Sequence, residues 1–386
     1  MNTFSFQLLA RDGEARRGRV TTARGSIETP AFMPVGTLGA VKGVPPWDLE
    51  QAGAEIMLCN LYHLSVRPGV GVIAARGGLH RWNGWGRPIL TDSGGFQVMS
   101  LRGLRSIDDQ GVSFRSHLDG ALLRFTPESV VADQERLGVD VAMVLDECPP
   151  WPATREAVSA ATARTFRWAA KARQAWRGGP EALFGIVQGG VEQDLREKAA
   201  ADLTGLDFPG YAIGGVSVGE PEELRHAVVR WTVPLLPELR PRYLMGVGTP
   251  VDLVAAAKRG IDLFDCVLPA RNARHGLLFT WNGPLRLKNA ALRDDDGPID
   301  ARCRCRVCVQ LGRSFLHHLF RAGEITAATL ATLHNVQFYL DFMAELRKAI
   351  ESGQLASFET SVRGAYGRSP ESGVGEGEES SQAREA

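Results

Sequence analysis

The chain has 386 residues, of which 44% are hydrophobic, and its acidic and basic side chains balance to a formal net charge of zero. This composition provides a core for one barrel-sized domain with additions or for two domains, and no apolar run approaches the length that crosses a bilayer. The N-terminus lacks the apolar core of a signal peptide, and the six cysteines fit a reducing compartment better than a disulfide framework. We therefore expect a cytoplasmic protein without disulfides.

Short apolar segments recur after an N-terminal region, residues 1–28, whose alternating pattern predicts antiparallel strands. There are eight, and nearly all end in Gly or a polar residue: 31–37, 55–60, 88–95, 141–147, 183–190, 211–215, 242–248 and 262–267. Helix-like segments lie between many of them, at 154–177, 191–204, 220–230 and 249–259. Apolar strands that alternate with helices are typical of a parallel α/β sheet. Eight such units predict a (β/α)8 TIM barrel over residues 29–290, and no G-x-G-x-x-G fingerprint indicates an open dinucleotide-binding sheet.

Three additions to the barrel are expected. A hairpin insertion lies at about 103–125, between the third and fourth units. Residues 291–366 are predicted to form an inserted zinc-binding subdomain near the C-terminus, with a helix over 326–352 that packs back on the barrel. Residues 367–386 are rich in Gly, Ser and Glu and contain little to bury, so they predict a disordered acidic tail.

A cluster of cysteines lies in the segment ARCRCRVC, at Cys303, Cys305 and Cys308. Thiolates are the ligands that zinc prefers. His334 is the favoured fourth ligand, because an unpartnered imidazole on its apolar helical stripe would be costly, and the nearby His317 and His318 are alternatives. A Cys3His set is typical of a structural Zn2+ site, which has no open position for chemistry, so catalysis is expected elsewhere.

The residues at the carboxyl ends of the predicted barrel strands are candidates for an active site, because TIM-barrel active sites lie at this end. They are Asp92, Asp146, Gln188, Gly214, Gly215, Met245, Gly246 and Asp265. Each aspartate alone is also consistent with a helix N-cap. Together with an amide, backbone N–H groups and Phe96 or Met245 for stacking, they fit a small, flat, polar ligand such as a nucleobase. Two carboxylates on facing strands can divide the roles of nucleophile and acid/base.

These segments resemble bacterial tRNA-guanine transglycosylases, the queuine tRNA-ribosyltransferase family. The resemblance rests on TDSGGFQVMS (91–100), SHLDG (116–120), LDECPP (145–150), FGIVQGG (184–190), YAIGGVSVGE (211–220), YLMGVGTP (243–250), FDCVLPARNARHG (264–276) and the C-x-C-x-x-C set with its distant His. It extends from near the N-terminus to about residue 366, and only the acidic tail lies outside it.

The resemblance implies exchange of guanine for preQ1 at the wobble position of tRNAs with a G-U-N anticodon, in queuosine biosynthesis, through a covalent enzyme-ribose intermediate. It implies that Asp265 is the nucleophile and Asp92 the general acid/base. The implied base-binding residues are Asp146, Gln188, Gly215, Phe96, Met245, Gly246, Cys148 and Val218. Arg271 and Arg274 are implied to contact the anticodon loop, and Cys303, Cys305, Cys308 and His334 to hold one structural zinc.

Several alternatives stay open at this point. A queuine-inserting enzyme of the same family is disfavoured by Val218, since that type carries a smaller residue here to admit a larger base. A non-catalytic tRNA-binding accessory subunit is disfavoured by the presence of both Asp92 and Asp265. A zinc-dependent hydrolase would need an open metal site at the strand ends, where no His pair is found. The resemblance also suggests a homodimer, with Phe315 and His318 as possible interface residues.

Overall fold

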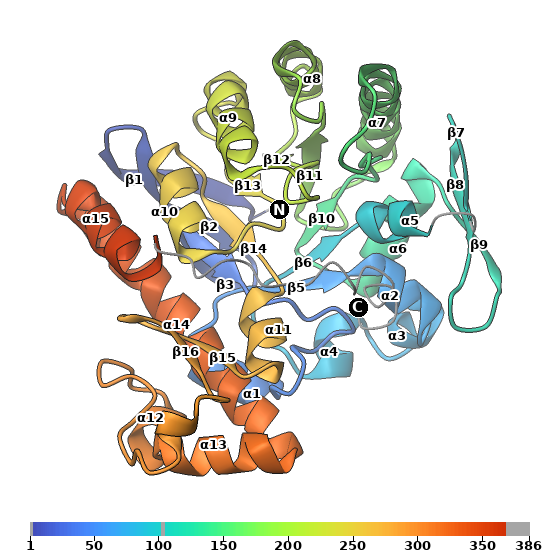
Figure 1. Ribbon diagram of the computed structural model, residues 1–386. Helices are drawn as coiled ribbons and strands as arrows, with labels where there is room; N and C mark the ends of the chain where they lie inside the picture. The colour runs from blue at the N-terminus through green and yellow to red at the C-terminus, as the bar shows by residue number, and fades with distance from the viewer. Residues whose placement is uncertain (1–2, 102–104, 368–386) are drawn as a thin grey trace.

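The computed structural model describes residues 3–101 and 105–367. Its centre is an eight-stranded parallel sheet (Figure 1). In chain order its strands are β4 (Ala31–Met33), β5 (Met57–Asn60), β6 (Ile89–Asp92), β10 (Val141–Met143), β11 (Ala182–Val187), β12 (Gly210–Ile213), β13 (Arg242–Leu244) and β14 (Leu263–Asp265). From β5 to β14, neighbours in this order pair in parallel, and β14 pairs with β4, which leaves β4 and β5 at the edges. A parallel bridge between Val35 and Leu58 joins the remaining two edges, so the sheet closes into a barrel.

Helices in the connections cover the outside of the barrel (Figure 1). They are α1 (Pro46–Gln51), α2 (Leu61–Val66), α3 (Val70–Ala74), α4 (Leu79–Asn83), α5 (Gly95–Ser100), α6 (Pro127–Leu137), α7 (Arg155–Ala175), α8 (Gln193–Thr204), α9 (Glu222–Thr232) with the 3-10 turn η1 (Val233–Leu235), α10 (Pro250–Lys258) and α11 (Leu268–Arg274). Thr126, Thr154 and Thr249 are the N-caps of α6, α7 and α10, and each side-chain oxygen accepts a backbone N–H from the first turn. The predicted helices in the second half of the barrel are therefore observed.

Two small antiparallel sheets flank the barrel. The chain begins with β1 (Ser5–Asp12), β2 (Ala15–Thr22) and β3 (Gly25–Thr29). Between β6 and β10 lies a second three-stranded sheet, β7 (Arg105–Asp108), β8 (Gly111–Arg115) and β9 (Leu122–Phe125). Both sheets lie in segments where the sequence predicts antiparallel structure.

The segment after α11 forms the C-terminal part of the molecule (Figure 1). It contains the hairpin β15 (Leu277–Thr280) and β16 (Gly283–Arg286), then η2 (Ala290–Leu292), α12 (Arg306–Gln310), α13 (Arg313–Ala322), α14 (Ile325–Glu351) and α15 (Leu355–Tyr366). A small apolar core of its own includes Leu278, Ile299 and Leu316. The predicted helix over 326–352 corresponds to α14.

The long helix α14 fastens this segment to the barrel. The Tyr339 hydroxyl donates to the Gly248 carbonyl at 2.6 Å, and its ring centroid lies 4.7 Å from that of Phe32 on β4. The Asn335 side chain donates to the carbonyls of Pro269 and Leu277 at 2.9 and 3.0 Å, so α14 holds the start of α11 and the start of β15. Because α11 follows β14 directly, these contacts help to position the end of that strand.

The predicted (β/α)8 barrel is confirmed by the closed parallel sheet and its covering helices. The domain boundaries at 28, 290 and 366 stay predictions. Of the predicted acidic tail, residues 367–386, only residue 367 is among the described residues. Gly103, at the start of the predicted insertion, lies outside them. Among the described residues, no helix has the length and apolar character needed to cross a membrane.

Candidate active site

Three aspartates meet at the carboxyl ends of the barrel strands. Asp92 is the last residue of β6, Asp265 the last of β14, and Asp146 lies shortly after β10. Burial raises the pKa of Asp92 to about 8, and the neighbouring carboxylates of Asp146 and Asp265 add to the rise, against hydrogen bonds from the backbone N–H groups of Ser93 and Gly94. The three carboxyl groups therefore form one electrostatically coupled site, with a proton on Asp92 at neutral pH.

Asp265 is held by donors from β13 and the loop after it. The Tyr243 hydroxyl and the Gly246 backbone N–H donate to the same oxygen of Asp265, Oδ1, at 2.6 and 2.7 Å. Burial raises the pKa of Asp265, but these two hydrogen bonds favour its ionised form and oppose the rise. Both bonds end on Oδ1, and neither of these two donors contacts Oδ2 of Asp265.

Asp92 has a different set of partners. The Asn60 side chain donates to Asp92 Oδ2 at 3.4 Å and to the Gln97 side-chain oxygen at 3.0 Å. Gly94 has a φ of +86°, and a Cβ there would lie 2.4 Å from the Tyr62 Cβ, so only glycine fits this turn without a shift. The DSGG segment thus turns sharply after the strand and leaves the Asp92 carboxyl at the mouth of the barrel.

Asp146 and Gln188 form a buried pair. The Gln188 amide donates to Asp146 Oδ2 at 2.6 Å, and the pKa of Asp146 is raised by burial to about 6 although this hydrogen bond lowers it. Gln188 Oε1 is buried and has no hydrogen-bond partner among the described residues. A buried acceptor without a partner is costly unless a ligand supplies the donor. The pair therefore presents acceptors to a ligand that carries N–H groups.

Glycines make room for this pair. A Cβ at Gly95 would lie 2.3 Å from Asp146 Oδ1, and one at Gly215 would lie 2.3 Å from Gln188 Oε1. Gly215 also has a φ of +66°, which side chains rarely adopt. The backbone of both loops can therefore approach the Asp146 and Gln188 side chains, and hence a ligand bound to them.

The other predicted pocket residues differ in their exposure. Phe96 lies on α5 with half of its side chain exposed, while Met245 and Val218 are partly buried. Cys148 is buried beside Asp146, and burial raises the pKa of its thiol to about 12. Cys148 is thus a neutral wall residue at physiological pH, not a nucleophile.

A buried arginine that the sequence analysis missed holds the loop after β11, which contains Gln188, and the loop after β12, which contains Gly215. Arg196 on α8 donates to four carbonyls, those of Val187, Gly190, Gly214 and Gly215, at 2.9, 2.8, 2.8 and 3.2 Å. Burial lowers the pKa of Arg196 to about 10, which still leaves it charged at neutral pH. Nothing in the local sequence distinguishes it from the exposed charges of α8, so only the tertiary structure reveals it.

Arg271 and Arg274 lie on α11, directly after Asp265. Arg271 is exposed and Arg274 partly so, and Arg274 donates to the Ala270 carbonyl at 3.0 Å. Both therefore lie close to Asp265 along the chain.

The predicted metal ligands converge in the C-terminal segment. The donor atoms of Cys303, Cys305, Cys308 and His334 all lie within 4.8 Å of one another, and all four residues are buried. His334 Nε2 lies 2.8 Å from the Phe279 carbonyl, which turns Nδ1 toward the sulfurs of Cys308 and Cys305 at 3.3 and 3.7 Å. This buried Cys3His cluster could hold a metal ion, and its donor set is that of tetrahedral zinc sites.

The two alternative ligands of the sequence analysis lie outside this cluster. His317 places its Nδ1 2.6 Å from the Leu287 carbonyl, and His318 is exposed on α13. Since the cluster lies in the C-terminal segment, it does not supply the open metal site at the strand ends that a zinc-dependent hydrolase would need.

The queuine tRNA-ribosyltransferase family model matches residues 12–368 of the chain. The chain belongs to this family. A queuine tRNA-ribosyltransferase of Methylobacillus flagellatus is 51% identical over 358 residues, which cover 93% of this chain and 97% of the relative. Enzymes of the same name from Desulforudis audaxviator and Nitrosomonas europaea are each 53% identical, over 355 and 353 residues that cover 91% and 92% of this chain and 95% of each relative.

Membership in the family confirms the predicted enzyme class, a tRNA-guanine transglycosylase. The matched residues include every strand of the barrel, the three aspartates at the strand ends and the Cys3His cluster. The residues that the sequence analysis did not find are those that hold the named ones in place: Tyr243, Asn60 and Arg196.

Proposed function

We propose that this chain exchanges guanine at the wobble position of tRNAs with a G-U-N anticodon for preQ1, as a step of queuosine biosynthesis, through a covalent bond between the ribose and the enzyme. The observation that carries this proposal is that two carboxyl groups at the carboxyl ends of the barrel strands have different hydrogen-bond partners and different charged neighbours. Asp265 accepts two hydrogen bonds on one oxygen, whereas burial beside other carboxylates raises the pKa of Asp92 to about 8. One group can attack as an anion while the other holds a proton.

In the first proposed step, an oxygen of Asp265 bonds to the anomeric carbon of the ribose as the bond from this carbon to guanine breaks. Asp92 gives its proton to the guanine, which would otherwise leave as an anion, and such acid assistance contributes about 10^2- to 10^4-fold. In the second step Asp92 accepts a proton from the incoming base, the base bonds to the anomeric carbon, and Asp265 leaves as a carboxylate. Two displacements preserve the configuration at this carbon.

The proposed base pocket reads the polar edge of guanine or preQ1. Asp146 accepts from the ring N–H and the amino group, while Gln188 and the Gly215 backbone complete the hydrogen bonds. The buried Gln188 oxygen without a partner supports this assignment, since a bound base can satisfy it. Phe96 and Met245 are proposed to stack on the base, and Gly246, Cys148 and Val218 to line the pocket.

Incubation with unmodified tRNA and radiolabelled guanine tests the proposed function directly. We expect label to enter the tRNA, and unlabelled preQ1 added afterwards to displace it. A tRNA whose wobble guanine is replaced by adenine is the matched control and should take up no label. Absence of incorporation into the G-U-N tRNA would contradict the proposal.

The acid and the recognition carboxylate should give base exchange a bell-shaped pH dependence. Asp146 must be ionised to accept from the base, so kcat/KM should rise as the pH passes its pKa of about 6. Asp92 must be protonated to assist guanine, so kcat/KM should fall as the pH passes its pKa of about 8. The maximum is therefore expected at about pH 7, with both limbs belonging to the coupled group of carboxylates. A rate that still rises above about pH 9 would contradict this assignment of the acid.

The pocket should prefer preQ1 over queuine. Val218 limits the space beside the base, which disfavours the larger queuine. Adenine should be rejected for another reason: each buried polar group that it leaves without a partner costs about 1–3 kcal/mol. We expect Val218→Gly to narrow the gap between preQ1 and queuine in kcat/KM, measured with each base against the same tRNA. Equal kcat/KM values for the two bases in the unsubstituted chain would favour the queuine-inserting alternative instead.

The proposed partners follow from the same family. Arg271 and Arg274, next to the mouth, are proposed to hold phosphates of the anticodon loop. The Cys3His cluster is proposed to hold one structural Zn2+ per chain, which stabilises the C-terminal segment and has no part in the chemistry. We further propose a cytoplasmic homodimer, and the exposed side chains of Phe315 and His318 on α13 support an interface there.

A further inference from the structure

Two loops of the proposed base pocket are each anchored by a buried carboxylate. After β12, Glu220 accepts the backbone N–H groups of Ser217 and Val218 at 2.6 and 2.9 Å, and its side chain is 1% exposed. After β13, Asp252 on α10 accepts the Thr249 hydroxyl at 2.8 Å, and its side chain is 6% exposed. The first anchor fixes the loop that contains Val218, and the second fixes the end of the loop that begins at Met245.

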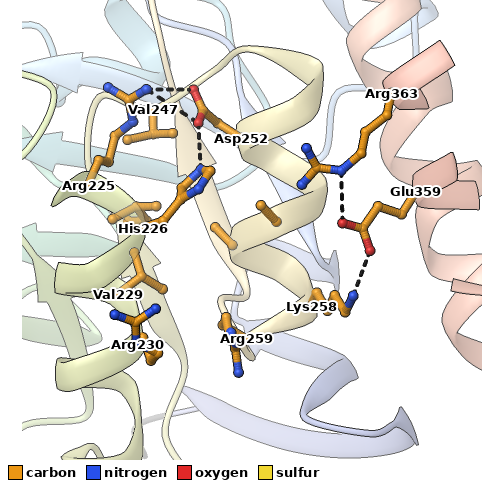
Figure 2. A pocket seen from close by; sticks show the side chains of 13 residues that line it. Arg225, His226, Val229, Arg230, Val247, Asp252, Lys258, Arg259, Glu359 and Arg363 are labelled. Carbon is orange, nitrogen blue, oxygen red and sulfur yellow. Dashed lines mark hydrogen bonds and ion pairs between the residues drawn. The ribbon is translucent and has the colours of Figure 1, made fainter. Parts of the chain in front are cut away.

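Arg225 on α9 lies between these two anchors. Its Nη2 donates to both oxygens of Asp252, at 3.2 and 3.4 Å, and its Nη1 forms an ion pair with Glu220 at 3.7 Å. Figure 2 shows Arg225 and His226 pointing from α9 to the Asp252 carboxylate on α10, and His226 Nε2 lies 3.0 Å from Asp252 Oδ1. The Arg225 side chain is only 18% exposed, so this bridge is largely shielded from water.

We propose that Arg225 is a positioning residue that sets the spacing of the two loops and thereby the affinity for the incoming base. The inference rests on the proposed function and adds to it a residue that does not contact the base. Without the guanidinium, the buried carboxylates of Glu220 and Asp252 lack a shared counter-charge, whereas its planar fork holds both in one geometry. The Val218 wall and the Met245–Gly246 backbone are thus held at a fixed separation across the pocket.

The anchors keep other partners when Arg225 is replaced. Glu220 still accepts its two backbone N–H groups and lies in the field of Arg196, which also holds the loop after β12. Asp252 still has Thr249 and His226. Loss of Arg225 should therefore loosen the spacing of the loops without unfolding the barrel.

Arg225→Met tests the proposal, because it keeps the apolar stem and removes the charge. We expect the KM for preQ1 to rise about ten-fold, equivalent to loss of about one charge-assisted hydrogen bond, with kcat at saturating base and the KM for tRNA nearly unchanged. Arg225→Lys should restore part of the affinity. Arg230→Met is the matched control. Arg230 is an exposed arginine of the same helix, and with Arg225 it lines the pocket between α9, α10 and α15 that Figure 2 shows, which is separate from the proposed base pocket.

A second readout does not depend on activity. Amide hydrogen exchange should quicken at Ser217 and Val218 in Arg225→Met and stay at its original rate in Arg230→Met. If the unsubstituted chain exchanges no base, the proposed function fails, but the exchange of these two amides still tests the bridge. The inference is overturned if Arg225→Met changes neither the KM for preQ1 nor these amides, or if it lowers only Tm and kcat. Should Arg225→Met fail to fold, Arg225→Lys carries the same expectations in smaller measure, because lysine keeps the charge but not the planar fork that holds both carboxylates.

Discussion

Asp265→Asn should lower base exchange by about 10^4-fold or more while tRNA binding survives. The asparagine oxygen can still accept from Tyr243 and Gly246, which contact only Oδ1 of the aspartate at 2.6 and 2.7 Å. Its amide nitrogen then replaces Oδ2, and an amide does not form the ester to the ribose. The shape and neighbours of the site are kept, so the loss is one of chemistry.

Incorporation of labelled guanine into tRNA measures this loss, and a gel-shift titration measures tRNA binding. The unsubstituted chain is the matched comparison: denaturing gels of this chain with tRNA should trap a tRNA covalently bound to the protein, whereas Asp265→Asn should trap none. Full exchange activity in Asp265→Asn would show that Asp265 is not the nucleophile. A covalent adduct in that variant would place the bond on another residue.

Removal of the metal is expected to have the second largest effect. Structural zinc contributes about 10–16 kcal/mol in zinc-finger peptides, and here the four ligands come from the ARCRCRVC segment and the middle of α14. Cys305→Ala should abolish the metal content, lower Tm by about 10–20 °C and weaken tRNA binding, because α13 and the segment before it lose their main attachment. Elemental analysis, thermal denaturation and the gel-shift titration give the three readouts.

The control for this prediction is another buried cysteine. Cys59 is fully buried in β5, outside the metal cluster, and Cys59→Ala should cost only the small amount typical of a slightly reduced core side chain. Freshly purified protein without zinc would contradict the structural site. Equal loss of metal in Cys59→Ala and Cys305→Ala would contradict the identity of the ligands.

The choice among three histidines shows where the sequence reaches its limit. Local spacing identifies Cys303, Cys305 and Cys308 as a ligand set, because they lie within six residues of one another. The candidate fourth ligand, His334, lies on α14, and the Phe279 carbonyl beside its Nε2 turns the ring toward the sulfurs. His317 has the same chemistry, but its Nδ1 is engaged by the Leu287 carbonyl.

By itself, the sequence determines the barrel and the residues that close its strands. Apolar runs that alternate with helices require a covered parallel sheet, and the carboxyl ends of its strands must meet at one mouth, so Asp92, Asp146 and Asp265 come together by topology alone. The pKa of each carboxyl group depends on partners distant in sequence. Burial and the neighbouring Asp146 and Asp265 raise the pKa of Asp92, whereas hydrogen bonds from Tyr243 and Gly246 oppose the rise that burial causes in the pKa of Asp265. Arg196 and Arg225 likewise differ from the other charges of their helices only in the depth of their burial and in the groups that face them. Only the tertiary structure decides these features, because hydrogen bonds and charge interactions act over a few ångströms in space, whatever the separation along the chain.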